Sequence, residues 1–214
     1  MKSILIIGLG KTGRHLAERF VELKNEVMVI DKKEDLVNDV APLVTASQIG
    51  DCSRDMYISS LGVQNFDICI CAIAEDFQAS LEITALLKDH NAKFLVAVAH
   101  SQVHEKFLYR IGADQVLYPE REIAFRIATQ YSMDNILDYI KVDGDYSILE
   151  IKAPASWIGK TIVQAQVRNK YMINIVAIKV NGKTTLMLDG DYVFNTEDTL
   201  FIMGDMKNIQ KLAK

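Results

Sequence analysis

The stretch I-L-I-I-G-L-G-K-T-G-R-H-L, residues Ile4 to Leu16, decides the fold of this chain. It contains G-x-G-x-x-G, the fingerprint of a dinucleotide-binding fold, and also G-K-T, which ends a phosphate-binding P-loop. A P-loop needs a further glycine five positions before Gly10, where this sequence has Leu5. The spacing therefore excludes a P-loop and leaves the dinucleotide fingerprint.

The residues on both sides of the glycines agree with this interpretation. The apolar run 3–7 is typical of a central parallel strand buried on both faces. Apolar residues recur at helical spacing over 14–23, and a second apolar strand, 26–30, ends at Asp31. This order of strand, glycine loop, helix, strand and acid is the one that a nucleotide-binding βαβ unit requires.

Each residue of the motif has a physical role in such a site. Gly8 allows the tight turn, Gly10 lets the backbone approach a phosphate, and Gly13 lets the helix pack closely on the strand. The helix N-terminus offers free N–H groups to phosphates, and Asp31 can accept hydrogen bonds from ribose hydroxyls. The sequence therefore predicts a nucleotide site.

Composition limits the class of protein. The 214 residues suffice for one large or two small domains, and the net charge of −4 gives no reason to expect nucleic acid as the main partner. No apolar run is long enough to cross a bilayer, so we expect a cytoplasmic protein without direct membrane insertion. An odd number of cysteines, three, fits a reducing compartment.

The first half of the chain alternates strands and helices. Further strands are expected around 43–46, ending at 72–74, and at 94–98 and 115–117. Six strands with helical crossovers predict an α/β fold with a Rossmann-like doubly wound parallel sheet. The loops after the strands, which hold the glycines, Asp31, Asp51–Cys52 and Ala72–Ala74, should then gather at one edge of the sheet.

Two pairs of side chains could have a chemical role. Cys69 and Cys71 lie on one face of a strand, where a redox or metal role competes with the favoured interpretation, small core residues. His100 and His104 have a spacing used for zinc, but no carboxylate or thiol is arranged beside them. We interpret the histidines as part of an exposed helix surface.

The second half of the chain changes character. A helical pattern extends from Pro119 to about Tyr139, with an apolar seam at Ile123, Ile127, Ile136 and Ile140. It could pack on the sheet or form a crossover arm to another subunit, and its length favours the arm. From Val142 a small α+β domain is expected, with a hairpin at Asn181-Gly182, a strand at 199–203 and a closing helix over 205–214.

Features of a dehydrogenase are missing from the sequence. No tyrosine has a lysine four positions later, and the segment after Val142 contains no histidine. No Ser-His-Asp spacing or metal cluster is apparent. The site is therefore predicted to hold a nucleotide without transforming it, and we interpret the chain as a binding protein, not an enzyme.

The chain also resembles a known family. The motifs that carry the resemblance are 7–13 (I-G-L-G-K-T-G), 29–31 (V-I-D), 50–53 (G-D-C-S), 111–114 (I-G-A-D), 118–120 (Y-P-E), 158–161 (I-G-K-T), 167–171 (V-R-N-K-Y), 175–178 (I-V-A-I) and 198–204 (D-T-L-F-I-M-G). Over essentially all of its length the chain is similar to the RCK regulatory proteins, in particular the KtrA/TrkA-type cytoplasmic subunits of bacterial potassium uptake systems.

The resemblance implies an organisation and an assembly. Residues 1–118 would form a nucleotide-binding RCK N-domain, 119–141 a crossover helix or dimerisation arm, and 142–214 an RCK C-terminal domain. Such proteins dimerise and form octameric rings beneath a membrane potassium-translocating subunit, at the inner face of the membrane. ATP versus ADP, or NADH versus NAD, would change the shape of the ring.

The resemblance also implies site residues. The nucleotide would be held by Gly8, Gly10, Lys11, Thr12, Gly13, Asp31, Lys32, Asp51, Cys52, Ala72, Ile73, Ala74 and Glu120. Glu120 would lie by the phosphates at the dimer interface and could share a cation with the terminal phosphate. In some relatives the second domain binds cyclic di-AMP, and the comparable positions here are Ile162, Val163, Arg168, Asn169 and Ile175.

Two departures from the family pattern keep the identity of the nucleotide open. KtrA-type proteins usually carry G-R-F-G where this chain has G-K-T-G at 10–13, and Lys11 lacks the forked donors of arginine. Near the end of strand five, where relatives commonly have a basic residue, this chain has Val98. Two other functions remain alternatives: a cytosolic NAD(P)-dependent oxidoreductase and a nucleotide sensor with a non-transport partner.

Overall fold

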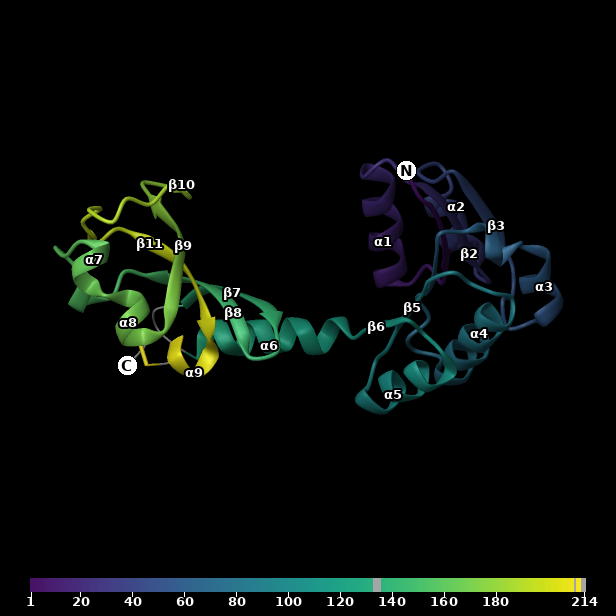
Figure 1. The fold of residues 1–214 in the computed structure, drawn as a ribbon. Coiled ribbons are helices and arrows are strands. Elements are labelled where there is room, and N and C mark those ends of the chain that lie inside the picture. Colours follow the sequence, from purple (N-terminus) through teal and green to yellow (C-terminus); the bar gives the residue numbers. More distant parts are fainter. Residues whose placement is uncertain (133–135, 210, 213–214) are drawn as a thin grey trace. The chain divides into compact units, whose positions relative to one another are not determined.

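The computed structural model describes residues 1–132, 136–209 and 211–212. The chain forms two compact units, Met1–Glu120 and Arg121–Lys214 (Figure 1). Among the described residues, no helix is both long and apolar enough to cross a membrane.

The amino-terminal unit is built on a six-stranded sheet in which all strands are parallel. The strand order is β3-β2-β1-β4-β5-β6, so the direction in which successive strands are added reverses between β1 and β4. The predicted doubly wound sheet is confirmed. Its strands are β1 (Ser3–Ile7), β2 (Glu26–Asp31), β3 (Ala46–Ile49), β4 (Ile68–Cys71), β5 (Leu95–Val98) and β6 (Gln115–Leu117).

Helices cover both faces of this sheet. They are α1 (Lys11–Glu22), α2 (Glu34–Val40), α3 (Asp55–Ser60), the short 3₁₀ helix η1 (Val63–Asn65), α4 (Phe77–Asp89) and α5 (Gln102–Ile111). Buried side chains of α1 and α2 join a core cluster on one face, and those of α3, α4 and α5 join a cluster on the other.

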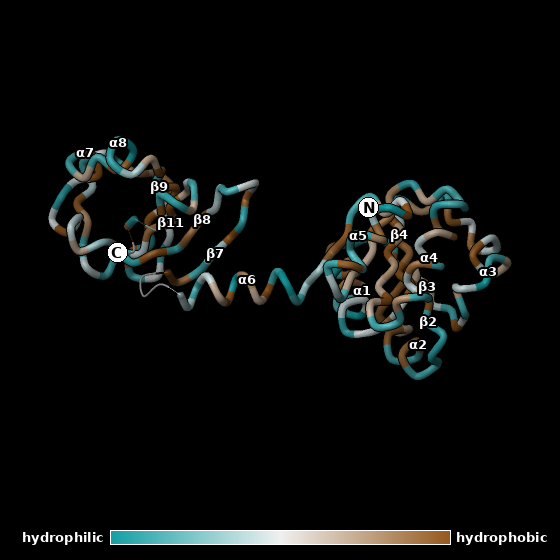
Figure 2. Tube along the Cα trace, turned by 90° about the horizontal axis from the view of Figure 1, so that it is seen from below, coloured by the Kyte–Doolittle hydropathy of each residue, from teal (hydrophilic) through white to brown (hydrophobic). Residues whose placement is uncertain are grey.

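Strand β1 shows why its sequence is an unbroken apolar run. Ile4 and Ile6 belong to the cluster under α1 and α2, whereas Leu5 and Ile7 belong to the opposite one. Successive side chains of a strand point to opposite faces, so a central strand covered on both sides has no position left for polar residues. Figure 2 shows this hydrophobic colouring along the strands inside the unit.

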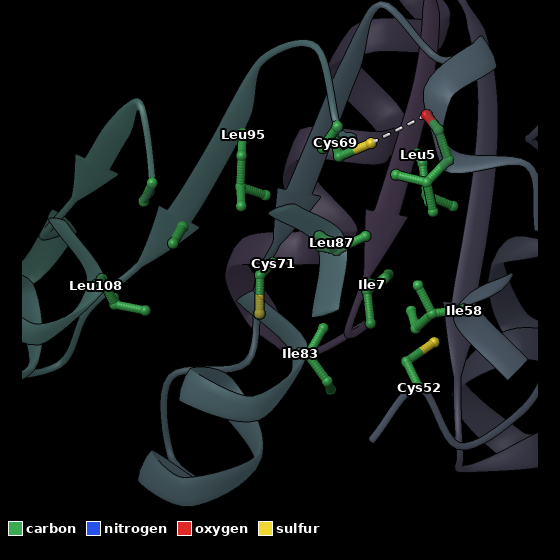
Figure 3. Packing of buried hydrophobic residues seen from close by; sticks show 14 of the residues in the cluster. Leu5, Ile7, Cys52, Ile58, Cys69, Cys71, Ile83, Leu87, Leu95 and Leu108 are labelled. Atoms are coloured by element: carbon green, nitrogen blue, oxygen red, sulfur yellow. Dashed lines mark hydrogen bonds between the residues drawn. The ribbon is translucent and has the colours of Figure 1, made fainter. Parts of the chain in front are cut away.

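The two cysteines of β4 lie in this core. Cys69 and Cys71 are both buried in the cluster with Ile83 and Leu87 of α4, as Figure 3 shows. The Cys69 thiol contacts the Val63 carbonyl oxygen at 3.9 Å, and burial raises its pKa to about 12. The prediction that both are core residues is confirmed.

Strand β3 does not lie where the sequence placed it. The predicted strand around 43–46 is wrong, because β3 runs from Ala46 to Ile49 at the edge of the sheet and pairs with Met28–Asp31. Its side chains are largely exposed, so its sequence carries little apolar signal. The apolar Val44 packs on the core just before the strand begins.

The helix that follows β6 is shorter than predicted. Helix α6 spans Pro119–Tyr131, and strand β7 already begins at Ile136, so the helical interpretation as far as Tyr139 is wrong. Ile136 and Ile140 are therefore strand residues and not part of a helical seam. The Arg126 guanidinium of α6 binds the Asp138 carboxylate of β7 at 2.8 Å, which joins helix and strand.

The carboxyl-terminal unit contains a five-stranded antiparallel sheet of order β10-β9-β11-β8-β7. Its strands are β7 (Ile136–Asp143), β8 (Tyr146–Lys152), β9 (Ile173–Val180), β10 (Lys183–Thr185) and β11 (Thr199–Asp205). Its helices are η2 (Ala155–Trp157), α7 (Ile162–Ala165), α8 (Val167–Tyr171) and α9 (Met206–Ile209). The core includes Trp157 and Phe194, whose ring centroids are 5.5 Å apart.

Two predictions about this unit have different outcomes. The hairpin at Asn181-Gly182 is confirmed, since both residues have positive φ, 49° and 78°, as a type I′ turn requires. The predicted closing helix over 205–214 is reduced to α9. Gln210, Ala213 and Lys214, at the end of that prediction, lie outside the described residues.

Candidate functional site

The glycine loop between β1 and α1 is held by close backbone contacts. Gly8 has a φ of +97°, and a Cβ there would lie 2.8 Å from Ile73 Cγ1 and 3.1 Å from the Ala72 carbonyl carbon. A Cβ on Gly13 would fall on the Gly8 carbonyl oxygen. Gly10, in contrast, has no atom within 4 Å of its would-be Cβ, so its outer side is open to a ligand.

The open side of Gly10 is also the N-terminus of α1. Gly10 is the N-cap residue, no side chain caps the helix, and the first turn contains no acidic residue. Lys11 is exposed and Thr12 half-buried at this end. The unbonded N–H groups of the first turn and the positive end of the helix dipole suit an anionic group such as a phosphate.

Asp31, at the end of β2, is bonded directly to the glycine loop. Its Oδ2 accepts a hydrogen bond from the Leu9 N–H at 2.6 Å, and its Oδ1 accepts one from the Lys33 N–H at 2.9 Å. A carboxylate oxygen can accept two hydrogen bonds, so both oxygens retain capacity for ribose hydroxyls. Lys32, which follows Asp31, is exposed.

The loop after β3 adjoins Asp31. The Gly50 N–H donates to the Asp31 carbonyl oxygen at 3.0 Å. The Asp51 carboxylate accepts hydrogen bonds from the Ser53 hydroxyl at 2.7 Å and the Ser53 N–H at 3.1 Å, and these bonds lower the pKa of Asp51. Cys52 is buried, which raises the pKa of its thiol to about 12, so the thiol is neutral and unreactive.

The loop after β4 is the fourth loop of the candidate nucleotide site. The Ala72 N–H donates to the Ile7 carbonyl oxygen at 2.8 Å, which places Ala72 beside the start of the glycine loop. Ala72 is buried, whereas Ile73 and Ala74 are half-buried. The residues from these four loops therefore lie at one edge of the sheet, at the β1/β4 switch, where doubly wound folds bind their ligands. Glu120 lies elsewhere along the chain, exposed at the start of α6.

The interpretation of the histidine pair as exposed helix surface is wrong for His104. This side chain is fully buried; its Nδ1 lies 2.9 Å from Nδ1 of His100 and its Nε2 lies 3.1 Å from Ser80 Oγ. Burial, followed by the neighbouring His100, lowers the pKa of His104. Among the described residues, no group of three or more histidines, cysteines or carboxylates could hold a metal ion.

A cavity of about 540 Å³ lies in the carboxyl-terminal unit, formed by α7, α8, β9 and the segment after β10. The five residues taken from the family resemblance, Ile162, Val163, Arg168, Asn169 and Ile175, all line it. Sequence reasoning missed four further lining residues, Gln166, Val167, Leu188 and Gly190. Gln166, between α7 and α8, and Val167 could have been found because they immediately precede Arg168 in the sequence. Leu188 and Gly190 are distant in the sequence, and spacing alone does not predict that they line the cavity.

Comparison with protein families supports a two-part chain. Residues 4–119 match the TrkA-N domain and residues 146–214 match the TrkA-C domain. The chain is 36% identical to Ktr system potassium uptake protein C of Bacillus subtilis (strain 168), over 100% of this chain and 96% of that protein. It is 34% identical to Ktr system potassium uptake protein A of the same organism, over 98% and 95%.

Solved structures show the same fold. The GsuK RCK domain matches with a TM-score of 0.69 and 19% identity, covering 99% of this chain and 47% of that one. The GsuK channel bound to NAD matches with a TM-score of 0.68 and 18% identity, covering 100% and 39%. The chain thus spans less than half of either GsuK chain. With both domain matches and full-length Ktr relatives, the chain belongs to the RCK family of TrkA-N and TrkA-C domain proteins, as a KtrA/TrkA-type member.

Proposed function

We propose that the chain is the regulatory subunit of a potassium uptake system, gated by an adenine nucleotide that binds at the loops after β1, β2, β3 and β4. The family supports the potassium system, since the relatives named above are Ktr potassium uptake proteins matched over nearly their whole length. One observation carries the nucleotide: the Asp31 carboxylate, bonded to the Leu9 N–H beside the open N-terminus of α1.

The nucleotide would lie across the edge of the sheet. Its phosphates would meet the N-terminus of α1 near Lys11, and its ribose would meet Asp31. ATP and ADP, or NADH and NAD, are the candidate pairs, and GsuK structures have been solved with NAD and with ADP. A ligand that binds one conformation of the assembly more tightly shifts the population toward it, which is the gating mechanism we infer.

Gating of this kind requires an assembly. We infer that α6 forms a dimer interface, because Ile123, Phe125, Ile127 and Tyr131 are all at least half exposed on it. The family resemblance extends this to an octameric ring at the inner face of the membrane, bound to a potassium-translocating subunit. In the ring, Glu120 would approach the nucleotide of a neighbouring subunit and share a cation with its terminal phosphate.

The cavity of the carboxyl-terminal unit is a second candidate site. Its volume suits a small molecule, and Arg168 supplies positive charge and forked donors for a phosphate. We propose that it takes cyclic di-AMP, the ligand that the resemblance implies. Titration of the full chain with cyclic di-AMP, with Arg168→Ala beside it, tests this separately from the first site.

Calorimetric titration with ATP, ADP, NAD and NADH tests the main proposal. We expect at least one to bind, with affinity lost by roughly tenfold or more in Asp31→Asn, because the amide cannot accept with both of its ends. Asp35→Asn, on the exposed start of α2, is the matched control and should bind like the wild type. Light scattering with each ligand should show whether two of them give different assemblies.

Three results would redirect the proposal. If none of the four nucleotides binds, the glycine loop is structural and the first site is rejected. If NADH is consumed with any carbonyl substrate, the chain is an oxidoreductase. If nucleotide binds but the chain does not alter potassium flux through a co-reconstituted Ktr-type membrane subunit, it is a nucleotide sensor for another partner.

A further inference from the structure

The order of the strands indicates where the base of a bound nucleotide would lie. The phosphate site is at the end of β1, and the ribose-binding carboxylate is at the end of β2, the next strand. Adjacent strands are about 4.8 Å apart, so a nucleotide that continues in this direction brings its base over the end of β3. The loop there is 50–53, which begins with Gly50.

The ring of Tyr57, on α3, lies against this loop. A Cβ added to Gly50 would lie 2.1 Å from Tyr57 Cζ and 2.2 Å from its hydroxyl oxygen, so the phenol end of Tyr57 occupies space that a glycine at position 50 leaves free. The Tyr57 hydroxyl lies 3.1 Å from Gln48 Oε1 and donates to it, so the ring end is fixed to β3. Tyr57 is half-buried and packs on the same core cluster as Cys52.

Hydrogen bonds hold the backbone at both ends of loop 50–53. The Gly50 N–H is bonded to the Asp31 carbonyl oxygen, and Asp51 is bonded to Ser53. These bonds set the backbone direction at each end. Between them, the phenol end of Tyr57 lies against Gly50 and limits how far the loop can shift at that residue.

We propose that Tyr57 is the positioning residue of the base subsite, holding the loop at Gly50 so that its backbone groups meet a purine in a fixed geometry. This inference rests on the proposed nucleotide function and adds to it the element that sets base selectivity. The ligand class is an adenine nucleotide, recognised at its base edge by the loop after β3.

The test compares each adenine nucleotide that binds with its hypoxanthine counterpart, ATP with ITP and NADH with deamino-NADH. These pairs share sugar and phosphates and differ only at position 6 of the base. We expect the wild-type chain to prefer adenine, and Tyr57→Leu and Gly50→Ala to reduce that preference by on the order of tenfold, the size of one lost base contact. Tyr57→Phe keeps the ring on Gly50 and should restore the preference to within about twofold of wild type.

Tyr109→Phe is a matched control, because it removes a tyrosine hydroxyl that contacts the Val116 N–H, away from the loop. An equal loss of affinity for both members of a pair would assign Tyr57 a merely structural role and overturn the inference. An unchanged preference in Tyr57→Leu and Gly50→Ala would also overturn it, while the nucleotide proposal stands. Absence of binding by the wild-type chain would overturn both. If Tyr57→Leu does not fold, the base preference of Gly50→Ala tests the inference in its place.

Discussion

At the residue scale, the glycines of one motif face different constraints. Gly8 has a φ of +97° and is enclosed by Ile73 and Ala72, whereas Gly10 has a φ of −60° and an open side. Alanine at Gly8 would meet both an unfavourable backbone conformation and a steric clash. Alanine at Gly10 would meet neither, but its methyl group would stand where we expect a phosphate.

We predict that Gly8→Ala lowers the free energy of unfolding by about 1–3 kcal/mol, while Gly10→Ala changes it by less than about 0.5 kcal/mol. Gly10→Ala should instead weaken nucleotide binding. Urea unfolding followed by far-ultraviolet circular dichroism measures the first effect, and calorimetry the second. Equal loss of stability in both variants would contradict this division of roles.

His104 makes the stability of the amino-terminal unit depend on pH. Its pKa in the folded chain is lowered, whereas an unfolded histidine has a pKa of about 6.5. Below that value the unfolded state binds more protons, so the free energy of unfolding falls as the pH drops, by at most about 1.4 kcal/mol per pH unit for this group.

Urea unfolding at pH 7, 6 and 5 measures this dependence. We expect His104→Gln to have a shallower pH dependence than the wild type, because the amide does not titrate. His15→Gln is the control, since the His15 side chain is 81% exposed and its loss should leave the slope unchanged. Identical slopes in the wild type and His104→Gln would show that the buried histidine does not carry the effect.

The sequence predicted the tight turn at Gly8 and the close packing at Gly13, but it did not predict the burial of His104. The tight turn at Gly8 and the close packing at Gly13 are local properties of a short motif, so spacing reveals them. The burial of His104 depends on Ser80, 24 residues earlier on another helix, and on His100, which precedes α5. No local pattern contains that information. The same holds for Tyr57, whose ring fits against Gly50 only after α3 has packed.

At the scale of elements, helix α7 depends on its first residue. Thr161 caps it through a reciprocal pair of bonds: the Gln164 N–H donates to Thr161 Oγ1 at 3.1 Å, and the Thr161 N–H donates to Gln164 Oε1 at 2.9 Å. The helix has four residues, so nothing else within it compensates for a lost cap. Two of these residues, Ile162 and Val163, line the cavity.

We predict that Thr161→Ala lowers the free energy of unfolding of the carboxyl-terminal unit by about 1 kcal/mol and weakens any ligand of the cavity. Fluorescence of Trp157, the single tryptophan of the chain, reports unfolding of this unit. Thr185→Ala, on the exposed strand β10, removes the same hydroxyl without a cap and should have a smaller effect. A larger loss in Thr185→Ala would refute the capping argument.

The wrong bounds predicted for β3 and for the helix after β6 both have a physical explanation. Edge strand β3 buries little, so burial leaves no apolar period in its sequence. Between α6 and β7, isoleucines at both helical and strand positions gave one continuous pattern, although Ile136 belongs to an antiparallel sheet paired with Ile151. Central strands such as β1 and β4, buried on both faces, were predictable because packing dictates every residue.

At the scale of the whole molecule, the two units have separate cores. Clusters in the first unit contain residues only up to Leu117, and the cluster around Trp157 begins at Ile136. We predict two unfolding transitions, one for each unit. A nucleotide should raise the free energy of unfolding of the amino-terminal unit only, by about 2.7 kcal/mol at a ligand concentration of 100 Kd.

Circular dichroism follows both transitions, while Trp157 fluorescence follows only the second. A nucleotide should therefore raise the unfolding midpoint of the amino-terminal unit, seen by circular dichroism. It should leave unchanged the midpoint of the carboxyl-terminal unit, seen by fluorescence. Cyclic di-AMP, if it binds the cavity, should do the reverse. A single transition, with both signals moving together for each ligand, would show that the two units unfold as one.

The position of β1 at the centre of its sheet has a consequence during synthesis. Strand β1 precedes both of its partner strands in the sequence, yet Ile4 must pair with Val27 on one side and with Ile68 on the other. At about 5–20 residues per second, the 64 residues from 5 to 68 take roughly 3–13 seconds to appear. For that time an apolar strand lacks one of its two neighbours, and transiently exposed apolar surface of this kind is what chaperones bind.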